Sequence, residues 1–252
     1  MYELFVTGTS LPDAYHKALL ALHENNDELP CPDYDTRQKE ASMTFVVENP
    51  LAEPMISKLF IGGFRELEQY RQEILDGILD FEIERGNWAY TYHSRMAEQI
   101  PFIVRELKRN PYSRRAVIDI RDWHYDAKEG NENPACLQHL HYFIRDGALH
   151  CKVLFRSNDA CKATFMNAFA LVMLQKRLAD ELGVAMGTYT HRANSYHCYE
   201  KDFPLLEGYV TRLNAADDGT GDVTFDYEGE WEYLMEMAQP EIAATVEELK
   251  SR

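Results

Sequence analysis

Between positions 136 and 167 the sequence places a thiol, a guanidinium, a hydroxyl, a carboxylate and a carboxamide: Cys136, Arg156, Ser157, Asp159 and Asn167. A cysteine thiolate is a nucleophile once a nearby cation stabilises it, and Arg156 is a candidate for that cation. An arginine beside a serine suits a phosphate group, because the guanidinium binds two oxygens and the hydroxyl adds a donor. The asparagine amide matches the O4 and N3–H edge of uracil. Together these side chains could hold a pyrimidine nucleotide against a sulfur atom.

The spacing of these residues adds a second signal. Arg156 lies 20 residues after Cys136, Asn167 lies 11 after Arg156, and His197, the first residue of a His-x-Tyr sequence, lies 30 after Asn167. In residue type and spacing, positions 90–199 resemble the thymidylate synthase family. The phrases around positions 90–93 and 190–197 are similar to a divergent branch of that family, which includes pyrimidine nucleotide hydroxymethylases.

The resemblance implies a reaction. Cys136 would attack C6 of the pyrimidine ring, and C5 would then take a one-carbon unit from 5,10-methylenetetrahydrofolate. Asn167 would read the base, and Asp159 would face both the base and the pterin. Tyr92 resembles the tyrosine of the C5 proton step, and His197 would hold the sugar 3′-hydroxyl.

The resemblance also implies a homodimer with shared active sites. Tyr199 would join His197 at the sugar, and Arg156 and Ser157 would bind the 5′-phosphate. The pair Arg114 and Arg115 is similar to the family's double arginine, which reaches the phosphate of the neighbouring subunit. Arg37 is a weaker match to an N-terminal phosphate arginine. Two residues, Glu53 and Glu66, could correspond to the catalytic glutamate of the family, and the sequence does not decide between them.

The sequence also leaves two points undecided: whether the product carries a methyl or a hydroxymethyl group, and whether the base is uracil or cytosine. Water reaching the site would give a hydroxymethyl group, and a dry site with hydride transfer would give a methyl group. The polar ending at positions 248–252 favours a 5-hydroxymethylase acting on CMP, dCMP or dUMP. Asn167 favours dUMP methylation, since in the family asparagine accompanies uracil, although its amide can flip. Ribose or deoxyribose and the pathway served stay undecided, and a noncatalytic nucleotide-binding homologue would bind without turnover.

Composition is typical of an ordinary cytoplasmic enzyme. At 252 residues and 45% hydrophobic content, residues 1–252 are expected to form a single domain. The net charge of −16 disfavours nonspecific nucleic-acid binding. Five cysteines without a CxxC pair suit a reducing compartment, and neither a leader nor a membrane span is expected. No third ligand accompanies His139 and His141, so no metal is expected.

Periodicity predicts a mixed α/β fold. Apolar residues recur at helical spacing over 64–81 and 164–182, with Gly183 as a C-cap, and Pro240 is expected to open a terminal helix. Short apolar runs predict strands at 116–120, 140–144, 148–155 and 186–190. The family resemblance implies more: a mixed twisted β-sheet with flanking helices, and a two-fold dimer formed by packing sheet against sheet.

Overall fold

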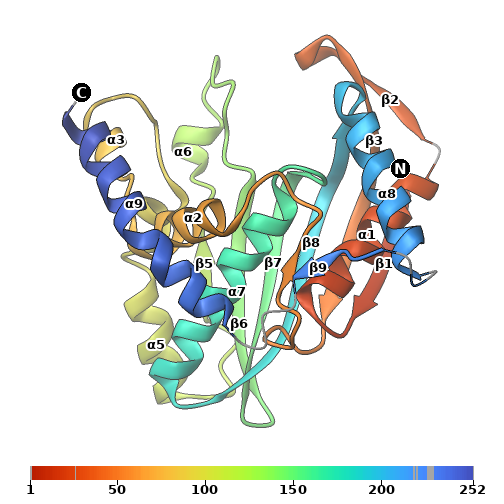
Figure 1. Cartoon of the computed structure of the whole chain (residues 1–252). Coiled ribbons are helices and arrows are strands. Elements are labelled where there is room, and N and C mark those ends of the chain that lie inside the picture. Colours follow the sequence, from red (N-terminus) through yellow and green to blue (C-terminus); the bar gives the residue numbers. More distant parts are fainter. Residues whose placement is uncertain (1, 26, 218, 220, 226–229, 252) are drawn as a thin grey trace.

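The central element of the fold is a mixed β-sheet. The computed structural model describes residues 2–25, 27–217, 219, 221–225 and 230–251 (Figure 1). Within these residues the sheet has the strand order β1-β3-β8-β7-β6-β5, with β2 paired to β3. The β1/β3 and β7/β8 pairs are parallel and the other pairs are antiparallel. The strands are β1 (Glu3–Gly8), β2 (Glu28–Cys31), β3 (Thr36–Val47), β5 (Val117–Asp119), β6 (Leu137–Arg145), β7 (Ala148–Asp159) and β8 (Ala185–Tyr199). A separate short pair joins β4 (Ile56–Ser57) to β9 (Thr224–Phe225).

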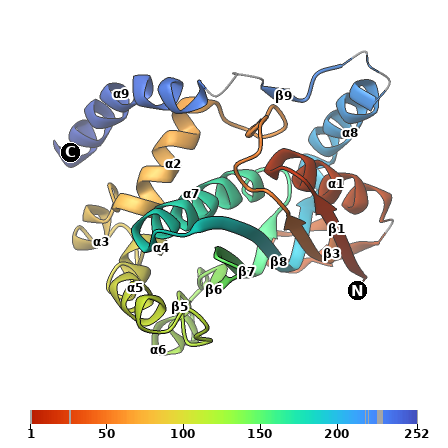
Figure 2. The same ribbon diagram turned by 90° about the horizontal axis from the view of Figure 1, so that it is seen from below.

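Helices cover the sheet in layers. Figure 2 shows α7 between the sheet and α2, with α9 beyond α2, while α1 lies over β1 and β3. The helices are α1 (Leu11–Glu24), α2 (Phe64–Asp76), α3 (Phe81–Glu84), α4 (Tyr92–Met96), α5 (Ile100–Arg109), α6 (Trp123–Asp126), α7 (Thr164–Leu182), α8 (Phe203–Asp217) and α9 (Trp231–Ser251), with 3₁₀ turns η1 (Pro32–Tyr34) and η2 (Glu200–Asp202). None of the described helices is both long and apolar enough to cross a bilayer.

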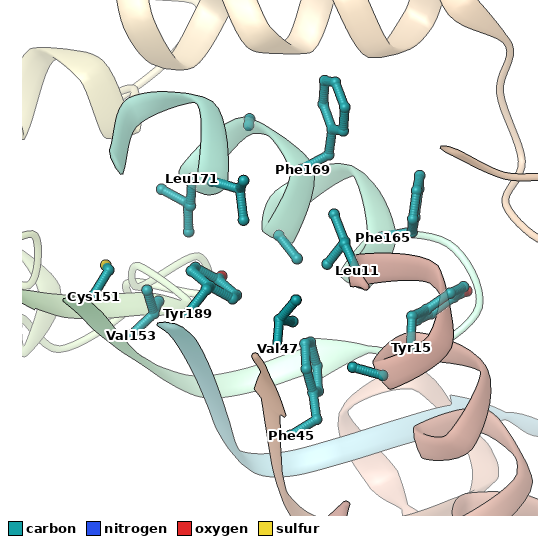
Figure 3. Packing of buried hydrophobic residues seen from close by; sticks show 14 of the residues in the cluster. Leu11, Tyr15, Phe45, Val47, Cys151, Val153, Phe165, Phe169, Leu171 and Tyr189 are labelled. Carbon is teal, nitrogen blue, oxygen red and sulfur yellow. The ribbon is translucent and has the colours of Figure 1, made fainter. Parts of the chain in front are cut away.

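The hydrophobic core fills the space between α7, α1 and the sheet. Figure 3 shows Val47, Val153 and Tyr189 pointing from the strands into this layer. Phe169 points the other way, and its ring meets that of Trp231 in α9 edge-on, with centroids 5.9 Å apart. Because α7 is apolar on both sides, it can pack on the sheet and on the outer helices at once. It therefore holds its N-terminal turn in a fixed position over the ends of β7 and β8.

The mixed α/β class with a twisted mixed sheet and flanking helices is confirmed. The helix α7 spans the predicted residues, and Gly183 ends it in the left-handed conformation at φ 66°. Two boundaries were wrong. The helix predicted over 64–81 ends at Asp76, because Gly77 adopts φ 63° and closes it early. Pro240 lies inside α9 instead of opening it, and the half of α9 after Pro240 is held by burial of Ile242 and Val246.

His16 provides a stability test of the packing between α1 and β4. Its Nε2 lies 2.7 Å from Ser57 Oγ, and burial lowers its pKa to about 4. An unfolded histidine titrates near pH 6.5, so below that pH the unfolded state binds a proton that the folded state excludes. The free energy of unfolding should therefore fall by about 2 kcal/mol from this group between about pH 7 and about pH 4.5.

Urea unfolding of the wild type and of His16→Gln at both pH values measures this contribution. The variant keeps a polar side chain but cannot take up a proton, so its stability should fall less on acidification. Equal losses for the two proteins would show that His16 does not exclude the proton in the folded state.

Candidate active site

A cavity of about 1020 Å³ lies at the carboxyl ends of the parallel strands β7 and β8. The register places Ser157 beside Ser195 and Asp159 beside His197, so residues about forty positions apart become neighbours. The loop before β6 and the first turn of α7 complete the walls. The cavity brings together most of the predicted site residues, namely Tyr92, Cys136, Arg156, Ser157, Asp159, Asn167, His197 and Tyr199.

Arg156 holds the turn that presents Cys136. Its Nη2 donates to the carbonyl of Pro134 at 2.7 Å and its Nε to the carbonyl of Ala135 at 3.1 Å. The backbone N–H of Arg156 also donates to the carbonyl of Cys136 at 2.8 Å. Because a guanidinium has five N–H donors, these bonds leave capacity to bind an anion in the cavity. Arg156 therefore places a positive charge and a half-buried thiol on the same wall.

A group of polar side chains lines the end of β7 and β8. Ser157 Oγ lies 3.4 Å from Nδ1 of His197, and the His197 and Tyr199 rings meet edge-on with centroids 4.8 Å apart. Burial lowers the pKa of His197, and the negative charge of Asp159 opposes part of this shift. Burial raises the pKa of Tyr199, which keeps its hydroxyl protonated. Asp159 Oδ1 accepts bonds from the backbone N–H groups of Cys161 (3.0 Å) and Lys162 (2.9 Å), which fixes the carboxylate.

Tyr92 and Asn167 face the cavity from two helices. Tyr92 is the first residue of α4, and its hydroxyl accepts a bond from the backbone N–H of Leu137, next to Cys136, at 3.3 Å. Burial raises the pKa of Tyr92, so its hydroxyl is neutral and can donate a hydrogen bond into the cavity. Asn167 lies in the first turn of α7, but its side chain bonds to other side chains and does not cap the helix.

The sequence analysis missed both residues that form hydrogen bonds with the Asn167 side chain. Tyr70 of α2 lines the cavity and accepts a hydrogen bond from Asn167 Nδ2. Asn158 also lines it and donates to Asn167 Oδ1 at 2.9 Å. Tyr70 belongs to the apolar stripe of its helix, which predicts only core packing. For Asn158 a signal did exist, since it stands between Ser157 and Asp159.

Three predicted arginines lie outside this cavity. Arg37 is exposed at the start of β3, where its Nη2 lies 3.3 Å from a carboxylate oxygen of Glu28. Arg114 and Arg115 are exposed in the turn before β5. None of the three lines the cavity that contains Cys136.

Neither candidate glutamate reaches the cavity. A carboxylate oxygen of Glu53 accepts the N–H of Met55 at 2.9 Å, and Glu66 accepts the N–H of Gly63 at 2.8 Å at the start of α2. Another carboxylate, that of Glu73, lines an adjoining pocket of about 210 Å³. Its pKa is raised by burial, with a hydrogen bond from Gln69 opposing the shift.

The adjoining pocket has aromatic walls. It shares Tyr70 and Tyr92 with the larger cavity and adds Trp88 and Tyr90. Flat aromatic side chains suit a flat ring system, which can stack on them. Among the described residues, no group of three or more His, Cys, Asp or Glu side chains is arranged to hold a metal ion.

A model of the thymidylate synthase family matches residues 66–219, which include most of the residues that line the cavity. The chain belongs to this family. It is accordingly an enzyme of the class that transfers one-carbon groups.

Related proteins agree with this assignment. A protein of Methanocaldococcus jannaschii named "Putative thymidylate synthase" is 32% identical over 189 residues, covering 70% of this chain and 83% of that protein. Thymidylate synthase 1 of Bacillus subtilis is 25% identical over 159 residues, covering 62% of this chain and 56% of that protein. The structure of thermostable thymidylate synthase A from Bacillus subtilis matches with a TM-score of 0.64 at 17% identity, over 81% of this chain and 85% of that one. The last comparison shows a shared thymidylate synthase fold.

Proposed function

We propose that this thymidylate synthase family member transfers a one-carbon unit to C5 of a pyrimidine nucleoside monophosphate, with Cys136 as the nucleophile. The observation that carries the proposal is the meeting of Cys136, Arg156 and Asn167, from three separate segments, in one cavity. Methylenetetrahydrofolate would supply the one-carbon unit. The aromatic pocket formed with Trp88 and Tyr90 suits its flat ring system.

The chemistry assigned to the chain starts at the sulfur atom. The Cys136 thiolate adds to C6 of the base, a C–S bond forms, and the C5–C6 π electrons move toward C5 and O4. Hydrogen bonds from the Asn167 amide stabilise the charge on the ring. C5 then bonds to the one-carbon unit and loses its proton near the Tyr92 hydroxyl, and the bond between that carbon and the folate nitrogen breaks to leave an exocyclic methylene on C5. Hydride from the released tetrahydrofolate would make this carbon a methyl group, and water would make it a hydroxymethyl group. The C–S bond then breaks and the thiolate is restored. Asp159 stands at the border between the base and the folate.

The nucleotide is held at its other end by polar groups. Arg156 and Ser157 bind the 5′-phosphate, while His197 and Tyr199 bind the sugar 3′-hydroxyl. A neutral His197, which its lowered pKa favours, can accept as well as donate a hydrogen bond. The chain 1–252 acts as one catalytic domain in this assignment.

The active site is completed in a homodimer. Arg114 and Arg115 are exposed and outside their own cavity, which suits a role in the cavity of a partner subunit. The sheet face away from α7 carries half-buried apolar side chains such as Phe143 and Leu154, which a second sheet would cover. Arg37 can bind the phosphate only if its guanidinium releases the carboxylate of Glu28.

Mixing two inactive variants tests the shared site. Cys136→Ser lacks the nucleophile, and Arg114→Ala/Arg115→Ala lacks the arginines offered to the partner. A heterodimer of the two has one site with both sets intact, so a statistical mixture should recover about a quarter of wild-type activity. Differently tagged chains confirm that heterodimers form. A heterodimer no more active than either parent would exclude arginines supplied from the partner.

The methyl and hydroxymethyl products are separated by one assay. The loop residues Asn131, Glu132 and Asn133, beside Cys136, are exposed and polar, and this supports water reaching C5 and a hydroxymethyl product. Asn167 supports uracil as the base. The enzyme is incubated with methylenetetrahydrofolate and each of dUMP, dCMP, UMP and CMP. A mass gain of about 14 identifies methylation and about 30 hydroxymethylation. No gain with any of the four would contradict the proposed function.

A further inference from the structure

Asn167 belongs to a chain of hydrogen bonds that runs from the cavity through the core to Tyr189. From the cavity inward, Asn167 Oδ1 lies 2.9 Å from Asn158 Nδ2, and Asn158 Oδ1 lies 2.9 Å from His191 Nε2. His191 Nδ1 lies 3.0 Å from the Tyr189 hydroxyl. At the other side, Asn167 Nδ2 contacts the Tyr70 hydroxyl. These five side chains are called the Asn167 relay below.

The histidine in the middle of the relay is neutral and immobile. His191 is fully buried, with its ring stacked between Phe45 (centroids 4.5 Å apart) and Phe155 (4.8 Å). Burial lowers its pKa to about 3. A neutral imidazole has one N–H and one acceptor nitrogen, so it passes hydrogen bonds along the relay in one direction only.

Two directions of the relay are self-consistent. If Nε2 of His191 carries the hydrogen, it donates to the amide oxygen of Asn158. The amide nitrogen of Asn158 then faces Asn167 and donates to the amide oxygen of Asn167. If Nδ1 carries the hydrogen, both amides flip, and Asn167 turns its nitrogen toward Asn158 and its oxygen toward Tyr70. The hydroxyl of Thr164, 2.8 Å from Asn158 Oδ1, is compatible with both because it can also donate to the carbonyl of Asp159.

The Tyr189 hydroxyl decides between the two directions. Tyr189 is fully buried, and within the described residues the structure gives its hydroxyl one hydrogen-bond partner, His191 Nδ1. When Nδ1 accepts, the O–H is satisfied. When Nδ1 donates, the Tyr189 O–H is buried without an acceptor, which disfavours that direction about tenfold to a hundredfold. The relay therefore holds the Asn167 oxygen toward Asn158 and the nitrogen toward Tyr70.

The direction matters because uracil and cytosine present opposite patterns. Uracil offers an N3–H donor and an O4 acceptor, and cytosine offers an N3 acceptor and an N4–H₂ donor. An asparagine amide that pairs with one base must flip to pair with the other. We propose that Asn158, His191 and Tyr189 are positioning residues that lock the Asn167 amide in one orientation and so make the enzyme select one of the two bases.

Replacing Tyr189 with phenylalanine tests this proposal, which rests on the proposed function. Tyr189→Phe removes one oxygen atom from a residue that does not line the cavity, and it removes the hydrogen-bond partner of His191 Nδ1. The ratio of kcat/KM for the preferred base over the other, measured with dUMP and dCMP or with UMP and CMP, should fall by about tenfold or more. The ratio of Kd values for the same nucleotides, measured without folate, should fall in parallel.

A matched control and a second variant sharpen the test. Tyr142 is also a fully buried strand tyrosine, but its hydroxyl takes no part in the relay, so Tyr142→Phe should keep the wild-type ratio. In its ionised form the aspartate of Asn158→Asp has only acceptor oxygens, so Asn167 must turn its amide nitrogen toward position 158. In this variant the ratio of kcat/KM values should reverse, so that the other base becomes the preferred one.

Histidine-labelled protein gives a readout that does not depend on activity. In ¹⁵N NMR spectra of the wild type, His191 should be the Nε2–H tautomer, and Tyr189→Phe should change its signals. A wild-type enzyme that does not discriminate between bases, an unchanged ratio in Tyr189→Phe, or an Nδ1–H tautomer in the wild type would each overturn the relay proposal. Failure of the proposed function is a different result, namely no turnover of any nucleotide by the wild type.

Discussion

Cys136→Ser is expected to lower kcat/KM by about three orders of magnitude or more, as loss of an obligatory nucleophile does. A serine hydroxyl is far less ionised than a thiol. Among the residues that the structure describes, the cavity offers Arg156 as a cation, and no hydrogen bond aligns a general base on the side chain at position 136. Cys136 is half-buried at the edge of the core, and serine differs from it by one atom of similar size, so the variant should fold. Steady-state kinetics with the nucleotide identified by the product assay measures the loss.

Cys31→Ser is the matched control for this change. Cys31 is half-buried and lines the same cavity from β2, but it is on a segment that carries no assigned chemistry. This variant should keep most of its activity. If Cys136→Ser is as active as Cys31→Ser, covalent attack by the sulfur of Cys136 is not part of the reaction.

Arg156→Lys is expected to have the second-largest effect, about two to four orders of magnitude in kcat/KM. A lysine cannot reproduce the paired bonds to the carbonyls of Pro134 and Ala135 or a bidentate contact to phosphate. Each charged hydrogen bond lost costs roughly 1.5 to 3 kcal/mol, and every 1.4 kcal/mol is about tenfold. Both kinetic constants should change, since KM reports the phosphate contact and kcat reports the position of Cys136.

The control for Arg156 is Arg105→Lys in α5. Arg105 is exposed, and no residue of α5 lines the cavity. Arg105→Lys should leave both kcat and KM unchanged. An Arg156→Lys enzyme with a raised KM and a normal kcat would contradict the role of Arg156 in holding the Cys136 turn, while a normal KM would contradict its role in phosphate binding.

The sequence predicted which residues line the site better than it predicted the hydrogen bonds between them. Cys136, Arg156, Asn167 and His197 are recognisable by type and spacing, and the structure places all of them on one cavity. The contact between Asn167 and Tyr70 joins positions 97 residues apart. No local pattern encodes such a contact, since Tyr70 falls at a helical core position and has the same periodicity as its apolar neighbours.

The strands that carry the site were predicted too short for a related reason. Apolar runs predicted strands ending at 155 and 190, but β7 continues to Asp159 and β8 to Tyr199. Backbone pairing between β7 and β8 extends the ladder through polar residues, which need no hydrophobic face to remain in a strand. The predicted fold class depended on the apolar parts of these strands, whereas the proposed chemistry uses residues at their polar ends.

Two of the predicted arginines lie where a single chain does not test their proposed role. Arg114 and Arg115 fit the family pattern by sequence, but in this chain they are exposed and do not line its own cavity. Their role can only be tested with two subunits present, which is the purpose of the mixed variants.

Trapping the covalent bond to Cys136 is the most direct test of the central claim. The enzyme is incubated with methylenetetrahydrofolate and the 5-fluoro analogue of its preferred nucleotide, whose fluorine cannot leave C5 as a proton does. Intact-protein mass spectrometry followed by peptide mapping then locates the adduct. We expect a stable adduct of protein, nucleotide and folate on the peptide that contains Cys136, absent in Cys136→Ser and present in Cys31→Ser. An active enzyme that forms no adduct, or forms it on another residue, would contradict the assignment of Cys136 as the nucleophile.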